Sequence, residues 1–361
     1  MTLGLGWPDV SRETGADMAS GRLGWPTDEA PAGDPAGPVS MTPLTTEGVD
    51  GDERLAAHLD DSPSVSVDDP ELARLRELLR IAGDDLRSRD DEPVRVISLA
   101  NQKGGVGKTS TAVNLAMALR LLGHRVLVVD MDPQGNATTA FDIDHDPGTP
   151  SVYDVLVNGK PLGDVVQETQ WSGLAVVPAT VDLAGAEVEL VSELGREARL
   201  RNALQQYLHE CEQSGSRYDF VFVDCPPSLG LLTVNALTAV TEVLVPLQCE
   251  YYALEGLGQL LSSVNLVKEH LNPQLRVSGV LLTMFDGRTK LAPQVVADAR
   301  EHLPELVLDT LVPRSVRVSE APSHGQTVLT YDPRSSGAQA YLAVAREFRE
   351  KGLSTGVPQS Q

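Results

Sequence analysis

Residues 101–110, which read NQKGGVGKTS, place two lysines and three glycines in a segment of ten residues. Glycines in such a loop let backbone N–H groups turn inward and surround phosphate oxygens at the N-terminus of a helix. Lys108 can then reach the outer phosphates of a nucleotide, and the Thr109 hydroxyl can bind Mg²⁺. The usual spacing, G-x-x-x-x-G-K-[ST], requires a glycine where this chain has Gln102, and the chain adds Lys103 beside the glycines. We interpret this departure as a phosphate-binding loop in which Lys103 has a role of its own.

Three aspartates follow apolar runs that are typical of buried strands. Asp130 ends the run RVLVVD, Asp132 stands two residues later, and Asp224 ends the run FVFVD. In isolation, carboxylates at positions i and i+2 are best interpreted as solvated turn residues. After a phosphate-binding loop, however, such a carboxylate can orient a water near the γ-phosphate or help to hold Mg²⁺. Cys225 is interpreted as a small buried residue, because no histidine stands near it in sequence to activate it as a nucleophile.

Strand-like and helix-like runs alternate from residue 94 onward. Strands are predicted at 94–100, 125–130, 174–177, 220–224, 242–246 and 276–282, and helices at 111–119, 196–212 and 254–271. Nearly continuous Val and Leu runs separated by helices are typical of parallel strands that are covered on both faces. The predicted fold class is therefore α/β, a P-loop NTPase with a mainly parallel twisted sheet flanked by helices. Ligands bind at the carboxyl ends of such strands, where the loop and the aspartates fall.

The charge of the chain is unevenly distributed. The 361 residues include 51 acidic and 29 basic ones, for a formal net charge of −22. Residues 1–92 hold 21 of the acidic and 8 of the basic residues, so they alone carry −13. The total disfavours a nucleic-acid partner, but the net charge of the whole chain is a poor guide to the charge of the folded part.

The cellular location is predicted from three further features of the sequence. The chain has three cysteines without metal-ligand spacing, and it has neither a membrane-span nor a signal-peptide pattern. These features predict a reduced, cytoplasmic protein with no membrane partner.

Composition also predicts the organisation outside the sheet. Residues 1–69 are predicted to be a disordered, acidic, Pro- and Gly-rich tail, because they contain too little apolar surface to offset the entropy of ordering. Residues 70–92 are predicted to be a short amphipathic helix, at 70–82, followed by a linker, and residues 351–361 a flexible C-terminal tail. The leucines that share one face of the predicted helix are Leu72, Leu75, Leu78 and Leu79.

The sequence LGWP occurs twice in the N-terminal tail, at 5–8 and at 23–26. Two interpretations stay open. The repeat is either chance in a biased segment, with Met41 as an alternative start, or a pair of docking motifs for a polar or scaffold partner, each an aromatic anchor held by a proline.

Together the loop and the aspartates resemble the ParA/MinD group of P-loop ATPases, whose deviant Walker A loop reads K-G-G-x-G-K-[ST]. The details are similar to the chromosome-partitioning ATPases ParA and Soj, and the resemblance covers about residues 94–350. It predicts a deviant Walker A ATPase domain at 93–350. The further matching runs are 130–138 (DMDPQGNAT), 177–180 (VPAT), 224–233 (DCPPSLGLLT), 248–256 (QCEYYALEG), 313–325 (PRSVRVSEAPSHG) and 331–335 (YDPRS).

The resemblance implies an ATPase that uses ATP and Mg²⁺. Lys103 matches the signature lysine, which reaches across an ATP-dependent homodimer to the phosphates bound by the partner. Lys108 matches the phosphate lysine, Thr109 the Mg²⁺ ligand, Asp132 the carboxylate needed for hydrolysis, and Asp224 the aspartate on the Mg²⁺ side. The loop 248–252 is implied either to respond to the nucleotide or to face the other subunit, and a purely structural role is the alternative. The remaining implied nucleotide-binding residues are Gly104, Gly105, Val106, Gly107, Ser110 and Pro313.

The resemblance further implies that the dimer binds DNA without sequence preference, through Lys and Arg side chains that neutralise phosphates. Arg288 and Arg317 match DNA-facing positions, and the alternative is that each is an ordinary surface charge. A ParB-type centromere-binding protein is implied as the partner that stimulates hydrolysis, and the nucleoid as the place of action. Weaker candidates for DNA contact are Lys351, Arg314, Lys290, Arg346 and Arg349.

Three alternatives differ in features that the sequence can test. A MinD-type ATPase ends in a basic amphipathic membrane helix, whereas residues 352–361 are polar and rich in Gly and Pro. A nitrogenase-reductase-like carrier needs paired cluster cysteines, which this chain lacks. A nucleotide-binding regulator without turnover stays open, and Asp132 argues against it.

Overall fold

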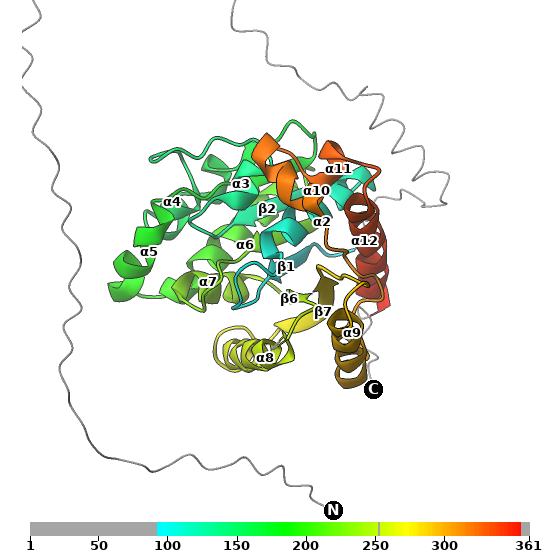
Figure 1. Cartoon of the computed structure of the whole chain (residues 1–361). Helices are drawn as coiled ribbons and strands as arrows, with labels where there is room; N and C mark the ends of the chain where they lie inside the picture. Colours follow the sequence, from blue (N-terminus) through cyan, green and yellow to red (C-terminus); the bar gives the residue numbers. More distant parts are fainter. Residues whose placement is uncertain (1–91, 252, 355–361) are drawn as a thin grey trace, which may run out of the picture. The chain divides into compact units, whose positions relative to one another are not determined.

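The computed structural model of the protein describes residues 92–251 and 253–354 (Figure 1). In this part of the chain seven strands form one sheet, in the order β3-β4-β2-β5-β1-β6-β7. All neighbouring strands pair in parallel except β3 and β4, which are antiparallel. The strands are β1 (Arg95–Leu99), β2 (Val126–Asp130), β3 (Gln167–Glu168), β4 (Leu174–Val177), β5 (Phe220–Asp224), β6 (Glu242–Gln248) and β7 (Arg276–Thr283).

Helices connect the strands and cover both faces of the sheet (Figure 1). The α-helices are α2 (Lys108–Leu121), α3 (Asn136–Thr139), α4 (Val152–Leu156), α5 (Leu183–Glu189), α6 (Arg199–Gln213), α7 (Leu231–Ala239), α8 (Ala253–His270), α9 (Leu291–His302), α10 (Val316–Glu320), α11 (Val328–Tyr331) and α12 (Ser336–Ser354). Single 3₁₀ turns lie at Leu162–Asp164, Leu190–Ser192, Arg196–Ala198 and Ala321–His324. None of the helices between residues 92 and 354, residue 252 aside, is long and apolar enough to cross a membrane.

The strands alternate their side chains between two hydrophobic cores. Phe220 and Phe222 of β5 face the core formed with α2, α3, α11 and α12, whereas Val221 and Val223 face the core formed with α4 to α9. Successive side chains of a strand point to opposite faces of a sheet, so a strand covered on both faces is apolar at every position. This is the reason that the continuous Val and Leu runs of the sequence predict the observed fold.

The predicted α/β fold with a mainly parallel sheet is confirmed, and the element boundaries differ in detail. β6 and β7 extend beyond the predicted ends at 246 and 282, and α2 begins three residues before the predicted 111. The short antiparallel strand β3 was not predicted, because two polar residues at a sheet edge give no apolar run. α12 continues to Ser354, so the first residues of the predicted C-terminal tail are helical. The predicted tail 1–69 and the helix at 70–82 lie outside the described residues.

A buried ion pair between the neighbouring strands β1 and β6 also contacts α12. Arg95 at the start of β1 donates two hydrogen bonds to Glu242 of β6, at 3.0 and 2.7 Å, and a third to the carbonyl oxygen of Phe348, at 2.8 Å. The guanidinium also lies 4.1 Å from the centroid of the Phe348 ring. Arg276 of β7 donates to Oε1 of Glu242, at 3.0 Å, the same oxygen that accepts from Arg95 Nε. These bonds lower the pKa of the buried Glu242 carboxyl, although burial itself acts in the opposite direction.

Candidate functional site

The phosphate-binding loop occupies the turn between β1 and α2, at the carboxyl edge of the sheet. Gly105 and Gly107 have positive φ angles of 73° and 90°, a left-handed conformation that other residues adopt with strain. Among the described residues, no other atom lies within 4 Å of where a Cβ at Gly104 or Gly105 would stand. The loop therefore leaves open space beside Gly104 and Gly105, next to the N-terminus of α2, where backbone N–H groups can bind phosphate oxygens.

Lys108 begins α2 and is buried at the base of this loop. Its ammonium group donates to the carbonyl oxygen of Lys103, at 3.4 Å. Burial lowers the pKa of Lys108, and the nearby Asp224 opposes that shift. A cation held here, partly stripped of water, interacts strongly with a polyanion that enters the loop. Thr109 and Ser110 follow in the first turn of α2, and both are half-buried.

Two polar residues hold the loop against the neighbouring strands. Asn101 donates from its side chain to the carbonyl oxygen of Pro246 in β6, at 2.8 Å, and accepts from the backbone N–H of Lys103, at 3.0 Å. Thr283, the last residue of β7, donates to the carbonyl oxygen of Val106, at 2.8 Å. The loop is thus fixed from two sides before any ligand binds. Sequence reasoning did not single out Asn101 or Thr283, because these contacts link segments more than 140 residues apart.

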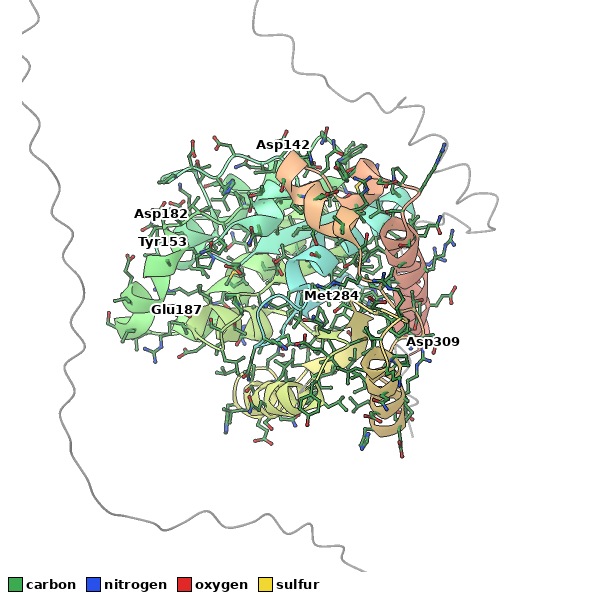
Figure 2. The ribbon with its side chains drawn as sticks, in the orientation of Figure 1. Asp142, Tyr153, Asp182, Glu187, Met284 and Asp309 are labelled. Carbon is green, nitrogen blue, oxygen red and sulfur yellow. The ribbon has the colours of Figure 1, made fainter. Side chains whose placement is uncertain are left out.

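The segment that follows β7 brings Pro313 to the same edge. Met284, labelled in Figure 2, turns the chain with a positive φ of 52° directly after Thr283. Phe285 then pairs in parallel with Pro313. Pro313 therefore lies beside the end of the strand that supports the loop, and its contact with a nucleotide stays a prediction.

Asp130 and Asp224 end adjacent strands and lie opposite each other in the sheet. Asp130 is completely buried and satisfied: it accepts from the Thr138 backbone N–H and hydroxyl, at 2.9 and 2.8 Å, and from the Asp132 N–H, at 3.1 Å. Burial raises the pKa of Asp130 to about 6. This pattern makes Asp130 a positioning residue, because it fixes the turn that carries Asp132.

Asp132 itself is largely buried, with 9% of its surface exposed. It accepts a hydrogen bond from the Gln134 backbone N–H, at 3.0 Å. Its charge acts on Lys108, which places the two side chains in the same electrostatic environment. Asp132 can therefore accept a proton or a hydrogen bond from a water in front of the phosphate loop.

Asp224 is buried, and within the described part of the chain neither of its carboxyl oxygens accepts a hydrogen bond of good geometry. Burial is the largest cause of its raised pKa, followed by the neighbouring Asp130, while the Thr109 hydroxyl and Lys108 act in the opposite direction. A buried carboxyl whose oxygens accept no hydrogen bond of good geometry is costly, and a bound divalent cation would offset that cost. Mg²⁺ with its coordinated water fits this place, because Thr109 supplies a second oxygen beside it.

Cys225 follows Asp224 and is fully buried. Burial is the main cause that raises the pKa of its thiol, which keeps the thiol protonated and unreactive. The interpretation of Cys225 as a small buried residue is therefore in agreement with the structure.

Lys103, in contrast to Lys108, points away from the floor of the loop. Its side chain is 47% exposed and forms an ion pair with Glu250, in the loop after β6. In the same loop Cys249 is buried, and its N–H donates to the Thr283 carbonyl oxygen, at 3.1 Å. In the segment that follows β6, Cys249 thus anchors the backbone to β7, and Glu250 contacts Lys103.

Three of the residues predicted to contact DNA lie on separate elements, and each of them is paired with an acid of its own chain. Arg288, in the turn after β7, is 88% exposed and makes two side-chain hydrogen bonds to Asp286, at 2.8 and 2.7 Å. Arg317 of α10 donates to Glu320, at 3.0 Å. Lys351 of α12 lies 3.1 Å from Glu347 and also donates to the Val307 carbonyl oxygen, at 3.3 Å. Binding to a phosphate would have to compete with these pairs.

A left-handed glycine loop before a helix, a buried lysine at the helix start, and aspartates at adjacent strand ends define a P-loop nucleotide hydrolase. Residues 94–277 match a family described as an AAA domain. Over 258 residues the chain is 51% identical to the sporulation initiation inhibitor protein Soj of Bacillus subtilis, covering 72% of this chain and 99% of that protein. The chromosome partitioning protein ParA of Myxococcus xanthus is 51% identical over 257 residues, which cover 71% of this chain and 88% of that protein. The chain therefore belongs to the ParA/Soj family of chromosome-partitioning ATPases.

Solved structures show the same fold. A cobyrinic acid a,c-diamide synthase from Mycobacterium smegmatis, with a bound ATP analogue and magnesium, aligns with a TM-score of 0.62 at 37% identity, covering 73% of this chain and 98% of that one. The septum site-determining protein MinD from Pyrococcus horikoshii, complexed with Mg-ADP, aligns with a TM-score of 0.58 at 25% identity, covering 73% of this chain and 100% of that one.

Proposed function

We propose that this ATPase works as a nucleotide-dependent dimer that binds DNA when ATP is bound and leaves it after hydrolysis. The observation that carries the proposal is the different placement of the two lysine side chains. Lys108 is buried under the loop, whereas Lys103 is exposed at its rim and contacts Glu250 rather than the base of the loop. A lysine at the rim is suited to reach phosphates held by a second copy.

ATP and Mg²⁺ are the ligands that the site fits. Backbone N–H groups of residues 104–110 and the Lys108 ammonium group would hold the phosphates, and Thr109 with Asp224 would hold Mg²⁺, Asp224 through water. Bound Mg²⁺ offsets the charge that develops on the phosphates. Asp132 would orient the attacking water, since its charge acts on Lys108 and the neighbouring Asp130 is already held by Thr138.

Lys103 of one subunit would stabilise the transferring phosphoryl group bound to the other. Charge spreads over the oxygens of that group during transfer, and a fixed cation beside it lowers the barrier. Because the cation comes from another chain, hydrolysis and dimerisation depend on each other. The Lys103–Glu250 pair must open for this step, so Glu250 favours the monomer.

DNA binding is proposed for the dimer, through Arg288 and Arg317, with Lys351 as a weaker contact. Few basic residues per subunit give weak binding, and dimerisation doubles the number of phosphates contacted. Affinity depends steeply on that number, so closing the dimer switches binding on. A ParB-type partner at a centromere-like site would stimulate hydrolysis and release the protein from the nucleoid.

Sedimentation of the protein with nonspecific DNA, with ATP, with ADP and without nucleotide, tests this function. Co-sedimentation is expected with ATP alone, and it should weaken steeply between two salt concentrations. Equal binding in all three nucleotide states would contradict the proposed switch, whereas absence of binding in every state would contradict the DNA contact. A polar or scaffold partner that binds the LGWP repeats is a separate proposal, and both repeats lie outside the described residues.

A further inference from the structure

A groove of about 630 Å³ lies at the amino edge of the sheet, opposite the phosphate-binding loop. Val94 stands just before β1, Tyr218 before β5 and Thr241 before β6, and all three line the groove. The phosphate loop, in contrast, follows the carboxyl end of β1. The groove is therefore separate from the nucleotide site.

The groove has an apolar floor and a polar rim. Val96, Leu204 and Tyr218 form buried parts of its wall, and Val94 and Leu208 are half-buried. The exposed residues of the rim include Gln205, His209 and Glu212 from α6. An apolar depression between polar rims, on the last turns of a helix, is suited to receive the apolar face of another helix.

The described chain begins in this groove, since Glu92 and Pro93 are part of its lining. Residues 83–91, nine in number, connect it to the sequence-predicted amphipathic helix at 70–82. A linker of this length spans at most about 30 Å when fully extended. A segment on such a short tether has an effective concentration in the millimolar range at the groove, so weak apolar contacts suffice to keep it bound.

We infer that residues 70–82 dock as an amphipathic helix into this groove of the same chain. Leu72, Leu75 and Leu79 have i, i+3 and i+7 spacing, so they form one stripe that extends over about 10 Å of helix. The arginines at 74, 76 and 80 provide cations for the rim, where Glu212 is exposed. Docking removes the leucine stripe and the groove floor from water together.

The docked helix has a consequence for the N-terminal tail. The tail is then attached at the amino edge of the sheet, whereas Lys103 and the phosphate loop lie at the carboxyl edge. A partner that binds residues 1–69 can therefore hold the protein without covering the rim at Lys103. Docking itself needs neither nucleotide nor DNA.

Disulfide trapping in the full chain tests the docking. Leu75→Cys on the leucine stripe is paired with His209→Cys on the groove rim; the natural cysteines are buried and do not compete. The matched control is Glu77→Cys with His209→Cys, which has nearly the same tether but the opposite helix face. We expect an intramolecular disulfide for the first pair, at a rate independent of protein concentration, and about tenfold less for the control.

Equal yields from the two pairs would overturn the inference, because an undocked tether samples both equally. Disulfide-linked dimers would assign the groove to a second copy instead and would also overturn it. Hydrogen exchange gives an independent measurement. The amides of residues 70–82 should exchange slowly in the natural chain and quickly in a Leu75→Asp/Leu79→Asp variant, and fast exchange in both would contradict docking.

Discussion

The ammonium group of Lys103 forms an ion pair with the Glu250 carboxylate across the rim of the phosphate loop. Both side chains are partly exposed, 47% for Lys103 and 34% for Glu250. An exposed ion pair of this kind contributes about 0.2–1 kcal/mol to the stability of the fold. Breaking it costs little free energy. The pair is therefore weak enough for Lys103 to leave it, as the proposed dimer requires.

Lys103→Ala should leave ATP binding by the monomer intact but abolish ATP-dependent dimerisation. It should also lower hydrolysis by about two orders of magnitude or more, because the cation beside the transferring phosphoryl group is lost. Nucleotide binding by fluorescence, and mass by light scattering, measure the two effects separately. Lys290→Ala, a lysine outside the loop, is the control and should dimerise normally.

The matched variant on the other side of the pair is Glu250→Gln. It should increase the ATP-bound dimer by no more than about fivefold, since only a surface ion pair is removed. A Glu250→Gln protein that no longer dimerises would show that Glu250 belongs to the dimer contact itself.

Asp132→Ala should trap the ATP-bound dimer. Without a carboxylate to orient the water, we expect hydrolysis to fall by about two to four orders of magnitude, while the phosphate loop stays intact. Gel filtration with ATP and release of inorganic phosphate are the measurements. Asp144→Ala, an exposed position on the loop after α3, should behave like the natural chain. A monomeric Asp132→Ala protein in ATP would rule out the assigned role.

Asp224→Asn should stabilise the metal-free protein at neutral pH and weaken its response to Mg²⁺-ATP. The folded pKa of Asp224 is raised, so the folded state binds the proton more tightly than the unfolded state. Stability then falls as pH rises from the unfolded pKa, about 4, through the folded one. Asp130, with a folded pKa of about 6, contributes the same trend between pH 4 and 6.

Thermal unfolding at pH 5 and pH 7.5, with and without Mg²⁺-ATP, measures this effect. Asp219→Asn is the control with the opposite sign: hydrogen bonds from His124 and the Arg125 N–H outweigh burial and lower the pKa of Asp219. Asp219 therefore stabilises the fold above its unfolded pKa, and its loss should lower Tm at pH 7.5. A lower Tm for Asp224→Asn at pH 7.5 would contradict an uncompensated buried charge at that position.

Arg288→Glu should weaken DNA binding by the dimer without affecting ATP-dependent dimerisation. If each subunit loses one phosphate contact, the slope of log K against log salt should decrease by about 1.8 for the dimer. Lys268→Glu, on the exposed side of α8, carries the same charge change and serves as the control. Loss of dimerisation in Arg288→Glu would instead identify Arg288 as a structural residue.

A second variant, at the acid that pairs with Arg288, should strengthen the same DNA contact. Asp286→Ala removes the acid that pairs with Arg288, so the guanidinium becomes available to a phosphate. DNA binding should therefore become tighter, and unchanged affinity would exclude Arg288 from the contact.

Glu242→Gln should destabilise the fold by about 3–5 kcal/mol, because it leaves the Arg95 guanidinium buried without its counter-charge. Arg276→Gln, whose side chain is 41% exposed, should cost less than about 1 kcal/mol. Urea unfolding of both variants measures the difference. Similar stability of the two would mean that the Arg95–Glu242 pair is not the stabilising element that its burial indicates.

Local sequence was sufficient to predict the fold class and to locate the phosphate loop and the aspartates at the strand ends. A strand covered on both faces is apolar at every position, so the strands around Ile97, Val128 and Phe222 could be predicted from their continuous apolar runs. The phosphate loop could also be predicted, because glycines and a Lys-Thr pair at a strand–helix turn have few other uses. β3 could not, since its two residues carry no pattern.

Tertiary structure decided which residues fix and tune the site. The Asn101–Pro246 and Thr283–Val106 bonds, and the Lys103–Glu250 pair, join segments that are distant in sequence, so no local pattern predicts them. The sheet order places Asp130 opposite Asp224, and this proximity together with burial raises the pKa of Asp224. The sequence by itself determined the residue types that the chemistry requires. The packing of distant segments determined the pKa shifts of the aspartates and the hydrogen bonds that hold the loop, because both depend on which groups lie beside each side chain in space.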